Sequence, residues 1–188
     1  MTNTNSDLGL GLEARTVSLV DSDPKWPEYF RVEAERIVEA LGSFARAVEH
    51  YGSTSVPELA AKPILDILVG TEKFGDSSPF AARLEPLGYE YAHWAGVSGH
   101  QVFGRGQPRT HLLHVVRFDG AEWHQALRFR DRLRSSIELR KAYSALKKEL
   151  AAKYPTNRPR YTAEKTSFIE AVVGSHGSVP SVPRPKTR

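Results

Sequence analysis

Residues 49–70 read EHYGSTSVPELAAKPILDILVG, and this stretch decides the fold. A turn at residues 52–55 is followed by residues 56–62, which we predict as a short helix that a proline then ends. The apolar run from Ile64 to Val69 has the length and composition of a buried strand. Asp66 is the single charge inside this run. An ionised carboxylate among apolar residues is costly unless something compensates it, so Asp66 is the first candidate for function.

The turn before this strand carries groups that suit an anion. Gly52 lets the backbone turn tightly and approach a ligand closely. The hydroxyls of Ser53, Thr54 and Ser55, with the free N–H groups of the expected helix start, would cradle a phosphate. Asp66 would then hold a divalent cation against that phosphate. In the alternative interpretation, the hydroxyls cap a helix and a buried Lys or Arg pairs with the carboxylate.

The pattern in residues 49–57 and 60–69 resembles the signature of the GrpB family, also called UPF0157. That family is similar to the nucleotidyltransferase superfamily, in which a Gly-Ser turn precedes a strand that carries two acids. Twelve residues separate Ser53 from Asp66, which fits this spacing. The resemblance extends over about residues 16–173. Its further matching positions are Asp23-Pro24, Trp26-Pro27, Leu87-Gly88-Tyr89, His111 to Val116, Phe129-Arg130-Asp131, Leu133-Arg134, Tyr143, Leu146-Lys147, Tyr161, Lys165 and Phe168.

The resemblance implies an α+β fold of the nucleotidyltransferase type, with a mixed sheet flanked by helices and a helical C-terminal part. It also implies an enzyme that binds ATP, or another nucleoside triphosphate, with Mg²⁺ and transfers a nucleotidyl group to a small-molecule acceptor. A carboxylate acceptor would become an acyl-nucleotide, as in an ATP-dependent ligase. The second acid of the superfamily would fall at Leu68, however. This departure favours an alternative, a catalytically degenerate nucleotide-binding or accessory module that interacts with another protein.

Five basic residues are candidates for phosphate contact: Lys62, Arg109, Arg130, Lys147 and Lys165. The resemblance implies the roles of Lys147 and Lys165. For Arg130 an ion pair with the neighbouring Asp131 is the alternative, and the pattern leaves both open.

The predicted strand from His111 to Phe118 carries two histidines. His111 and His114 are three residues apart, so on a strand they face opposite sides of the sheet. We predict that His114 shares the face of Asp66 and acts there as a general base or orients phosphate. The alternative for each histidine is a partly buried hydrogen-bonding role.

The second half of the chain is strongly basic. Between Arg128 and Arg160 there are eleven Lys or Arg residues and three acids. Such a segment attracts polyanions, although exposed helix faces are the plain alternative. Few aromatic side chains are interleaved with these charges, which disfavours nucleic acid and favours a small phosphate ligand.

Composition limits the class of protein. The chain has 188 residues, 40% of them hydrophobic, and no cysteine, which excludes disulfides and thiolate metal sites. No apolar run is long enough to span a membrane, and the N-terminus does not resemble a signal peptide, so a cytoplasmic location is expected. We predict a disordered segment at residues 1–15, one domain at 16–173 and a flexible basic tail at 174–188. The oligomeric state is left open.

Helical periodicity is clearest outside the central stretch. We predict a helix that begins near Asp23-Pro24 and runs to Gly42, and three more helices in the second half, at Glu122 to Arg134, Ile137 to Tyr154 and after Thr162. Besides the strands above, residues 89–94 alternate like a strand. Helices that follow a strand-rich half indicate an α+β arrangement.

Overall fold

The computed structural model describes residues 9–93 and 98–174. Its strands are β1 (Ala47–Tyr51), β2 (Leu65–Thr71), β3 (Tyr89–Tyr91), β4 (Gln101–Arg105) and β5 (His111–Arg117). Its α-helices are α1 (Trp26–Leu41), α2 (Ser78–Leu84), α3 (Ala121–Ser135), α4 (Ile137–Lys153), α5 (Arg158–Ala163) and α6 (Thr166–Gly174). Short 3₁₀ turns are η2 (Gly42–Phe44), η3 (Ser53–Ser55) and η4 (Glu85–Leu87).

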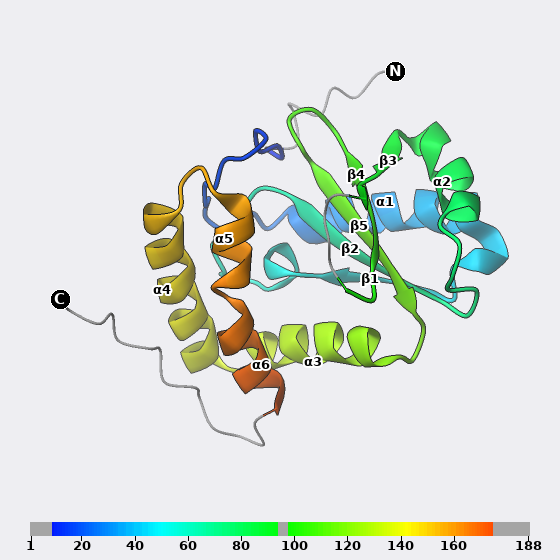
Figure 1. Cartoon of the computed structure of the whole chain (residues 1–188). Coiled ribbons are helices and arrows are strands. Elements are labelled where there is room, and N and C mark those ends of the chain that lie inside the picture. The colour runs from blue at the N-terminus through cyan, green and yellow to red at the C-terminus, as the bar shows by residue number, and fades with distance from the viewer. Residues whose placement is uncertain (1–8, 94–97, 175–188) are drawn as a thin grey trace.

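The strands form one mixed sheet in the order β1-β2-β5-β4-β3 (Figure 1). The central strands β2 and β5 are parallel, and every other neighbouring pair is antiparallel. Tyr51 of β1 pairs with Asp66 of β2, and Leu68 pairs with His114 of β5. The predicted α+β class, with a mixed sheet flanked by helices, is confirmed.

The two faces of the sheet pack against different helices. On one face, Ile67 of β2 and Leu113 of β5 join Ile37 of α1 and Phe80 of α2 in a fully buried apolar cluster. Because side chains alternate along a strand, Leu68 points to the other face, where it packs with Val116 and with Trp123 of α3. Asp66 lies on this second face, two residues before Leu68.

A third layer is made of helices alone. Figure 1 shows α4, α5 and α6 gathered beside the sheet, with α3 running toward them. Their shared core contains Tyr143 of α4 and Phe168 of α6, whose rings stack with centroids 5.3 Å apart. Val56 and Leu59, from the connection between β1 and β2, are buried in the same core. The turn before Asp66 is therefore held between the sheet and the C-terminal helices.

The short helix predicted for residues 56–62 is wrong. The turn itself forms η3, and the chain then runs irregularly to β2. Val56 is extended because the residue before a proline is driven from the helical region, and Glu58 adopts a positive φ of 62°. This path lets Leu59 enter the helical core, and no α-helix start follows the turn.

The prediction of disorder through residue 15 does not hold for residues 9–15. Leu10 and Leu12 are buried, and Leu12 exchanges two backbone hydrogen bonds with Arg109, at 3.0 Å each. Residues 1–8 and 175–188, where disorder and a flexible tail were predicted, lie outside the described residues. The predicted strand at residues 89–94 is shorter, because β3 ends at Tyr91, and residue 94 also lies outside. No helix in the described part of the chain combines the length and the apolar character needed to cross a membrane.

Candidate functional site

The turn after β1 lies directly against Asp66. Gly52 has φ 70° and ψ −171°, a conformation that only glycine adopts readily. A Cβ atom at Gly52 would stand 2.4 Å from Oδ2 of Asp66, so even alanine does not fit without a shift. The absence of a side chain at Gly52 therefore lets the turn lie against the carboxylate of Asp66.

Asp66 is a partly buried acid whose pKa is raised. Burial raises the pKa of its carboxyl group, and four cations oppose that rise: Lys62, Lys165, Arg158 and Lys147. Within the described chain, none of these cations comes within ion-pairing distance of the carboxylate. One carboxylate thus interacts with four basic side chains. When all five groups are ionised, the net charge of the set is +3.

Lys147 of α4 links the helical layer to the turn. Its side chain is 1% exposed, and its Nζ donates hydrogen bonds to Oγ of Ser53, at 3.0 Å, and to the carbonyl of Ala60. Burial, together with the nearby Lys165 and Lys62, lowers the pKa of Lys147 to about 7. Lys147 therefore changes its charge near neutral pH. It lies beside the Ser53 hydroxyl, which was predicted to bind phosphate.

Lys62 and Lys165 both lie close to the ring of Tyr161. Their Nζ atoms lie 5.8 and 4.4 Å from the centre of the Tyr161 ring. Both side chains are partly exposed. Burial lowers the pKa of Lys165 to about 7, and the proximity of Lys62 adds to this effect. The structure brings together Gly52, Ser53, Lys62, Asp66, Lys147 and Lys165, and we call this set, with Arg158, the Asp66 cluster.

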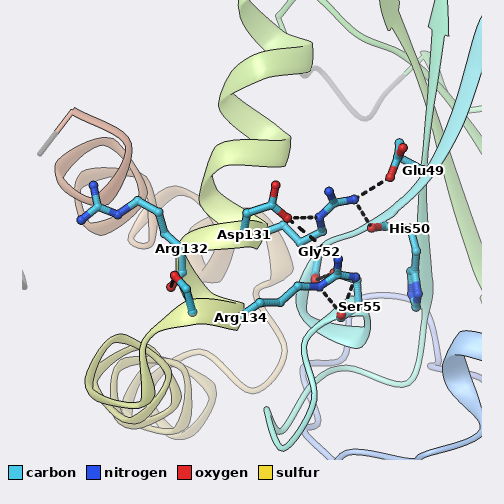
Figure 2. Close-up of polar contacts among 9 residues, drawn as sticks. Glu49, His50, Gly52, Ser55, Asp131, Arg132 and Arg134 are labelled. Carbon is cyan, nitrogen blue, oxygen red and sulfur yellow. Dashed lines mark hydrogen bonds and ion pairs between the residues drawn. The ribbon is translucent and has the colours of Figure 1, made fainter. Parts of the chain in front are cut away.

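The other two hydroxyls of the turn bond to protein groups. Oγ1 of Thr54 lies 3.0 Å from Nε2 of His50, and Oγ of Ser55 donates to the carbonyl of Gly52 at 2.6 Å. Figure 2 shows Arg134 of α3 reaching the carbonyl of Ser55, to which its Nε and Nη2 donate at 3.0 and 2.9 Å. Thr54 and Ser55 thus stabilise the conformation of the turn, whereas the Ser53 hydroxyl contacts Lys147 of the Asp66 cluster.

Arg130 is engaged in ion pairs. Its guanidinium forms ion pairs with Glu49 of β1 and with Asp131, at 2.7 Å each, and donates a hydrogen bond to the carbonyl of His50 at 3.0 Å. Figure 2 labels these three partners, Glu49, Asp131 and His50. The ion-pair interpretation of Arg130 is the one that the geometry supports. Arg109, the other predicted arginine, is partly exposed and lies close enough to Arg158 to lower its pKa.

His114 shares the face of Asp66, and His111 lies on the opposite face, as predicted. His114 is 8% exposed, its Nδ1 lies 3.2 Å from Nδ1 of His100, and its ring packs edge-on against Tyr51. Burial lowers the pKa of His114 to about 3, and His100 and Lys62 contribute to this effect. His114 is therefore neutral at pH 7.

A resident metal ion fits these residues poorly. Asp66 is the single carboxylate of the Asp66 cluster, and the residues at 9–93 and 98–174 contain no group of three or more His, Cys, Asp or Glu side chains arranged to hold a metal. Leu68, where a second acid would stand, is fully buried in apolar contacts. The donor set suits an anion better than a dication.

A shallow surface hollow lies on the other side of the turn. It is lined by Pro27, Ser55, Pro57, Glu58, Arg134 and Arg140. It shares Ser55 with the turn but includes no member of the Asp66 cluster. We place the candidate site at Asp66, because several groups with shifted pKa values gather there: Asp66, Lys62, Lys147, Lys165 and Arg158.

Sequence reasoning assigned no specific role to Arg158, which it counted only as one charge of the basic segment. Its place in the Asp66 cluster depends on where the fold puts α5 relative to Asp66, and no local pattern reports that position. Tyr143 and Tyr161, whose rings lie near Lys147 and Lys165, are among the positions of the GrpB resemblance, but the sequence does not place them beside these lysines.

Comparisons with known proteins identify relatives of the chain. The family model described as "GrpB protein" matches residues 16–174. The chain is 34% identical over 170 residues to the glutamate-rich protein GrpB of Alkalihalophilus pseudofirmus, covering 87% of this chain and 98% of that protein. It spans 66% and 46% of two longer UPF0157 proteins, from Pseudomonas aeruginosa and Bacillus subtilis.

The chain is also similar to a protein of known structure and, over a shorter stretch, to an enzyme. The crystal structure of the conserved protein GrpB from Enterococcus faecalis is similar with a TM-score of 0.75 and 37% identity, over 83% of this chain and 94% of that one. A dephospho-CoA kinase from Mycolicibacterium paratuberculosis is 34% identical over 76 residues, which are 39% of this chain and 19% of the kinase. The fold, the family model and the relatives agree, and the chain belongs to the GrpB family.

Proposed function

We propose that the protein binds a nucleoside triphosphate such as ATP through its phosphates at the Asp66 cluster and transfers the nucleotidyl group to a small-molecule acceptor. The observation that carries this proposal is the excess of cations around Asp66, beside a glycine turn that presents the Ser53 hydroxyl. Phosphate oxygens supply the negative charge that such a group of cations lacks.

In this proposal the lysines bind phosphate, and Asp66 and His114 accept protons. Lys62, Lys147 and Lys165 bind the phosphates and stabilise the charge that develops on the departing pyrophosphate. An acceptor oxygen or nitrogen attacks the α-phosphorus, and the bond from that phosphorus to the bridging oxygen breaks. A proton from a hydroxyl or amine acceptor passes to Asp66, whose raised pKa makes it a better base than an exposed carboxylate. His114, neutral at pH 7, offers a second place for that proton.

Magnesium enters the proposal only as the ion that accompanies ATP. With a single carboxylate at hand, the described residues do not assemble a metal site of their own. No step above depends on a protein-bound ion, and the lysines supply the positive charge that a second metal supplies in two-metal enzymes.

A second candidate function is a nucleotide-binding or accessory module without turnover. The buried Leu68, in place of a second acid, favours it. The partial similarity to a dephospho-CoA kinase is compatible with such a role, since it covers 19% of that enzyme. Both candidates share the nucleotide site and differ in what Asp66 does there.

Calorimetry and a turnover assay with one set of variants test both candidates. Wild-type protein is titrated with ATP, with and without Mg²⁺, and then incubated with ATP and a panel of alcohols, amines and carboxylic acids while pyrophosphate release is measured. Lys147→Met should lower the affinity for ATP about tenfold, because one buried cation is lost. Lys153→Met, at the exposed end of the same helix, is the matched control and should bind like wild type.

Asp66→Asn separates transfer from binding alone. It removes a negative charge that repels phosphate, so its affinity for ATP should equal or exceed that of wild type. If transfer is the function, its pyrophosphate release should fall at least a hundredfold. Binding by wild type without any release, across the panel, would favour the accessory module. Wild-type protein that binds no nucleotide would contradict both candidates.

A further inference from the structure

Arg158 presents two hydrogen-bond donors that have no partner. Its Nε and Nη2 are both buried, and neither finds an acceptor among the described residues. The other buried side-chain atoms of this kind are single atoms, on Trp26, Gln101 and Arg105. Arg158 is thus the residue in the described chain that leaves one whole edge of a charged group unsatisfied, and buried polar groups are rarely left so without a reason.

The charges around Arg158 do not explain the free edge. Burial lowers the pKa of its guanidinium, Asp66 raises it, and Arg109 lowers it again. Asp66 is shared with three lysines and does not reach ion-pairing distance of Arg158. Arg158 lies near a second cation, Arg109, and the one nearby carboxylate, that of Asp66, also interacts with three lysines. Arg158 therefore lacks a counter-ion of its own.

The free edge has the shape of an oxyanion receptor. Nε and Nη2 of a guanidinium point in the same direction at the spacing of two oxygens on one carboxylate or phosphoryl group. A lysine ammonium, which is a point charge, does not offer this match. The residue as a whole is partly exposed, so part of it is open to solvent.

We propose that Arg158 binds two oxygens of one substrate group side-on, either the terminal phosphoryl of the nucleotide or the carboxylate of the acceptor. The inference rests on the proposed function for the presence of a nucleotide at the Asp66 cluster, but the free edge is a property of the chain itself. Lys62, Lys147 and Lys165 then supply charge, and Arg158 supplies the orientation of one oxyanion.

The test compares two arginines of one short helix. Arg158→Lys keeps the charge and removes the paired donors, whereas Arg160→Lys changes an exposed guanidinium that pairs with Glu164 at 3.2 Å. Arg158→Gln is a second variant, for the case in which lysine perturbs folding, and circular dichroism checks all three. Each protein is titrated by calorimetry with ATP, AMP, tripolyphosphate and succinate.

Arg158→Lys should bind at least one oxyanion probe about tenfold more weakly, and Arg160→Lys should stay within twofold of wild type. Weaker ATP and tripolyphosphate binding with unchanged AMP binding identifies the terminal phosphoryl as the ligand. Weaker succinate binding alone identifies a carboxylate.

Unchanged affinity of both Arg158 variants for every probe that wild type binds would overturn the inference, as would wild-type protein that binds none of them. Wild-type protein that binds succinate or tripolyphosphate but not ATP would contradict the proposed nucleotide instead, and the Arg158 comparison would still be decided.

Discussion

Lys147 and Lys165 lose part of their positive charge near neutral pH, because burial lowers the pKa of each to about 7. A phosphate bound between two ammonium groups favours their protonated forms and therefore raises both pKa values in the complex. Binding must then take up protons wherever the free lysines are partly neutral. Since the free protein is increasingly neutral above pH 7, the affinity for phosphate falls as the pH rises.

The affinity for ATP should consequently fall roughly tenfold between pH 7 and pH 8.5 for each lysine that must be protonated. Calorimetry in buffers of different ionisation heat measures the affinity and the proton uptake together. In Lys147→Arg the guanidinium stays charged throughout this range, so the dependence on pH should become shallower. Lys153→Arg, at the exposed end of α4, should keep the wild-type profile. A constant affinity from pH 7 to 8.5 would remove the two lysines from the phosphate site.

At the scale of elements, the turn between β1 and β2 is held from three sides. Lys147 of α4 donates to Ser53, Arg134 of α3 donates to the carbonyl of Ser55, and His50 of β1 pairs with Thr54. These contacts stabilise a turn in which residue 52 has a φ of 70°, a conformation that glycine adopts readily and other residues do not. The turn is therefore rigid before any ligand arrives, and it positions the Ser53 hydroxyl in advance.

Gly52→Ala tests whether the close approach to Asp66 matters. The new methyl group meets Oδ2 of Asp66 at 2.4 Å and also strains the backbone, whereas Gly42→Ala, at φ 50°, has open space around its methyl group. Gly52→Ala should lower the free energy of unfolding by about 1–3 kcal/mol more than Gly42→Ala does. Urea denaturation measures both values. Equal losses in the two variants would show that the contact between the turn and Asp66 is loose.

The local part of this site could be predicted from sequence. Gly52, Ser53 and Asp66 lie within one short stretch, and period-two alternation places His114 on the same face. The rest depends on contacts between distant segments. Lys147 donates a hydrogen bond to Ser53 across 94 positions of the chain, and Arg158 acts on Asp66 only because the fold brings α5 near it. The predicted helix at residues 56–62 is absent for two reasons: Val56 precedes a proline, which is a local signal, and Leu59 is buried among later helices, which is not.

At the scale of the whole molecule, the site depends on the union of the sheet and the C-terminal helices. Asp66 and the turn belong to the sheet, whereas Lys147, Arg158 and Lys165 come from the helical layer. The buried core of that layer also contains Val56 and Leu59 from the sheet connection. Loosening the helical core should therefore loosen the sheet with it, and the chain should unfold as one cooperative unit.

Phe168→Ala tests this cooperativity from the far end of the chain. The side chain is 4% exposed and stacks on Tyr143, so its removal should lower the free energy of unfolding by about 3–5 kcal/mol. Ile137→Ala, at a side chain that is 54% exposed, is the control and should lose less than about 1 kcal/mol. Urea unfolding is followed by circular dichroism, which reports the helices, and by tryptophan fluorescence. Of the three tryptophans of the chain, Trp26 and Trp123 pack outside the helical core, and Trp94, which lies outside the described residues, is replaced by phenylalanine in all the proteins compared. The two signals should shift to the same lower midpoint in Phe168→Ala. A fluorescence transition that keeps its wild-type midpoint while the helical signal is lost earlier would show that the two parts unfold separately, and that the site can come apart without the sheet.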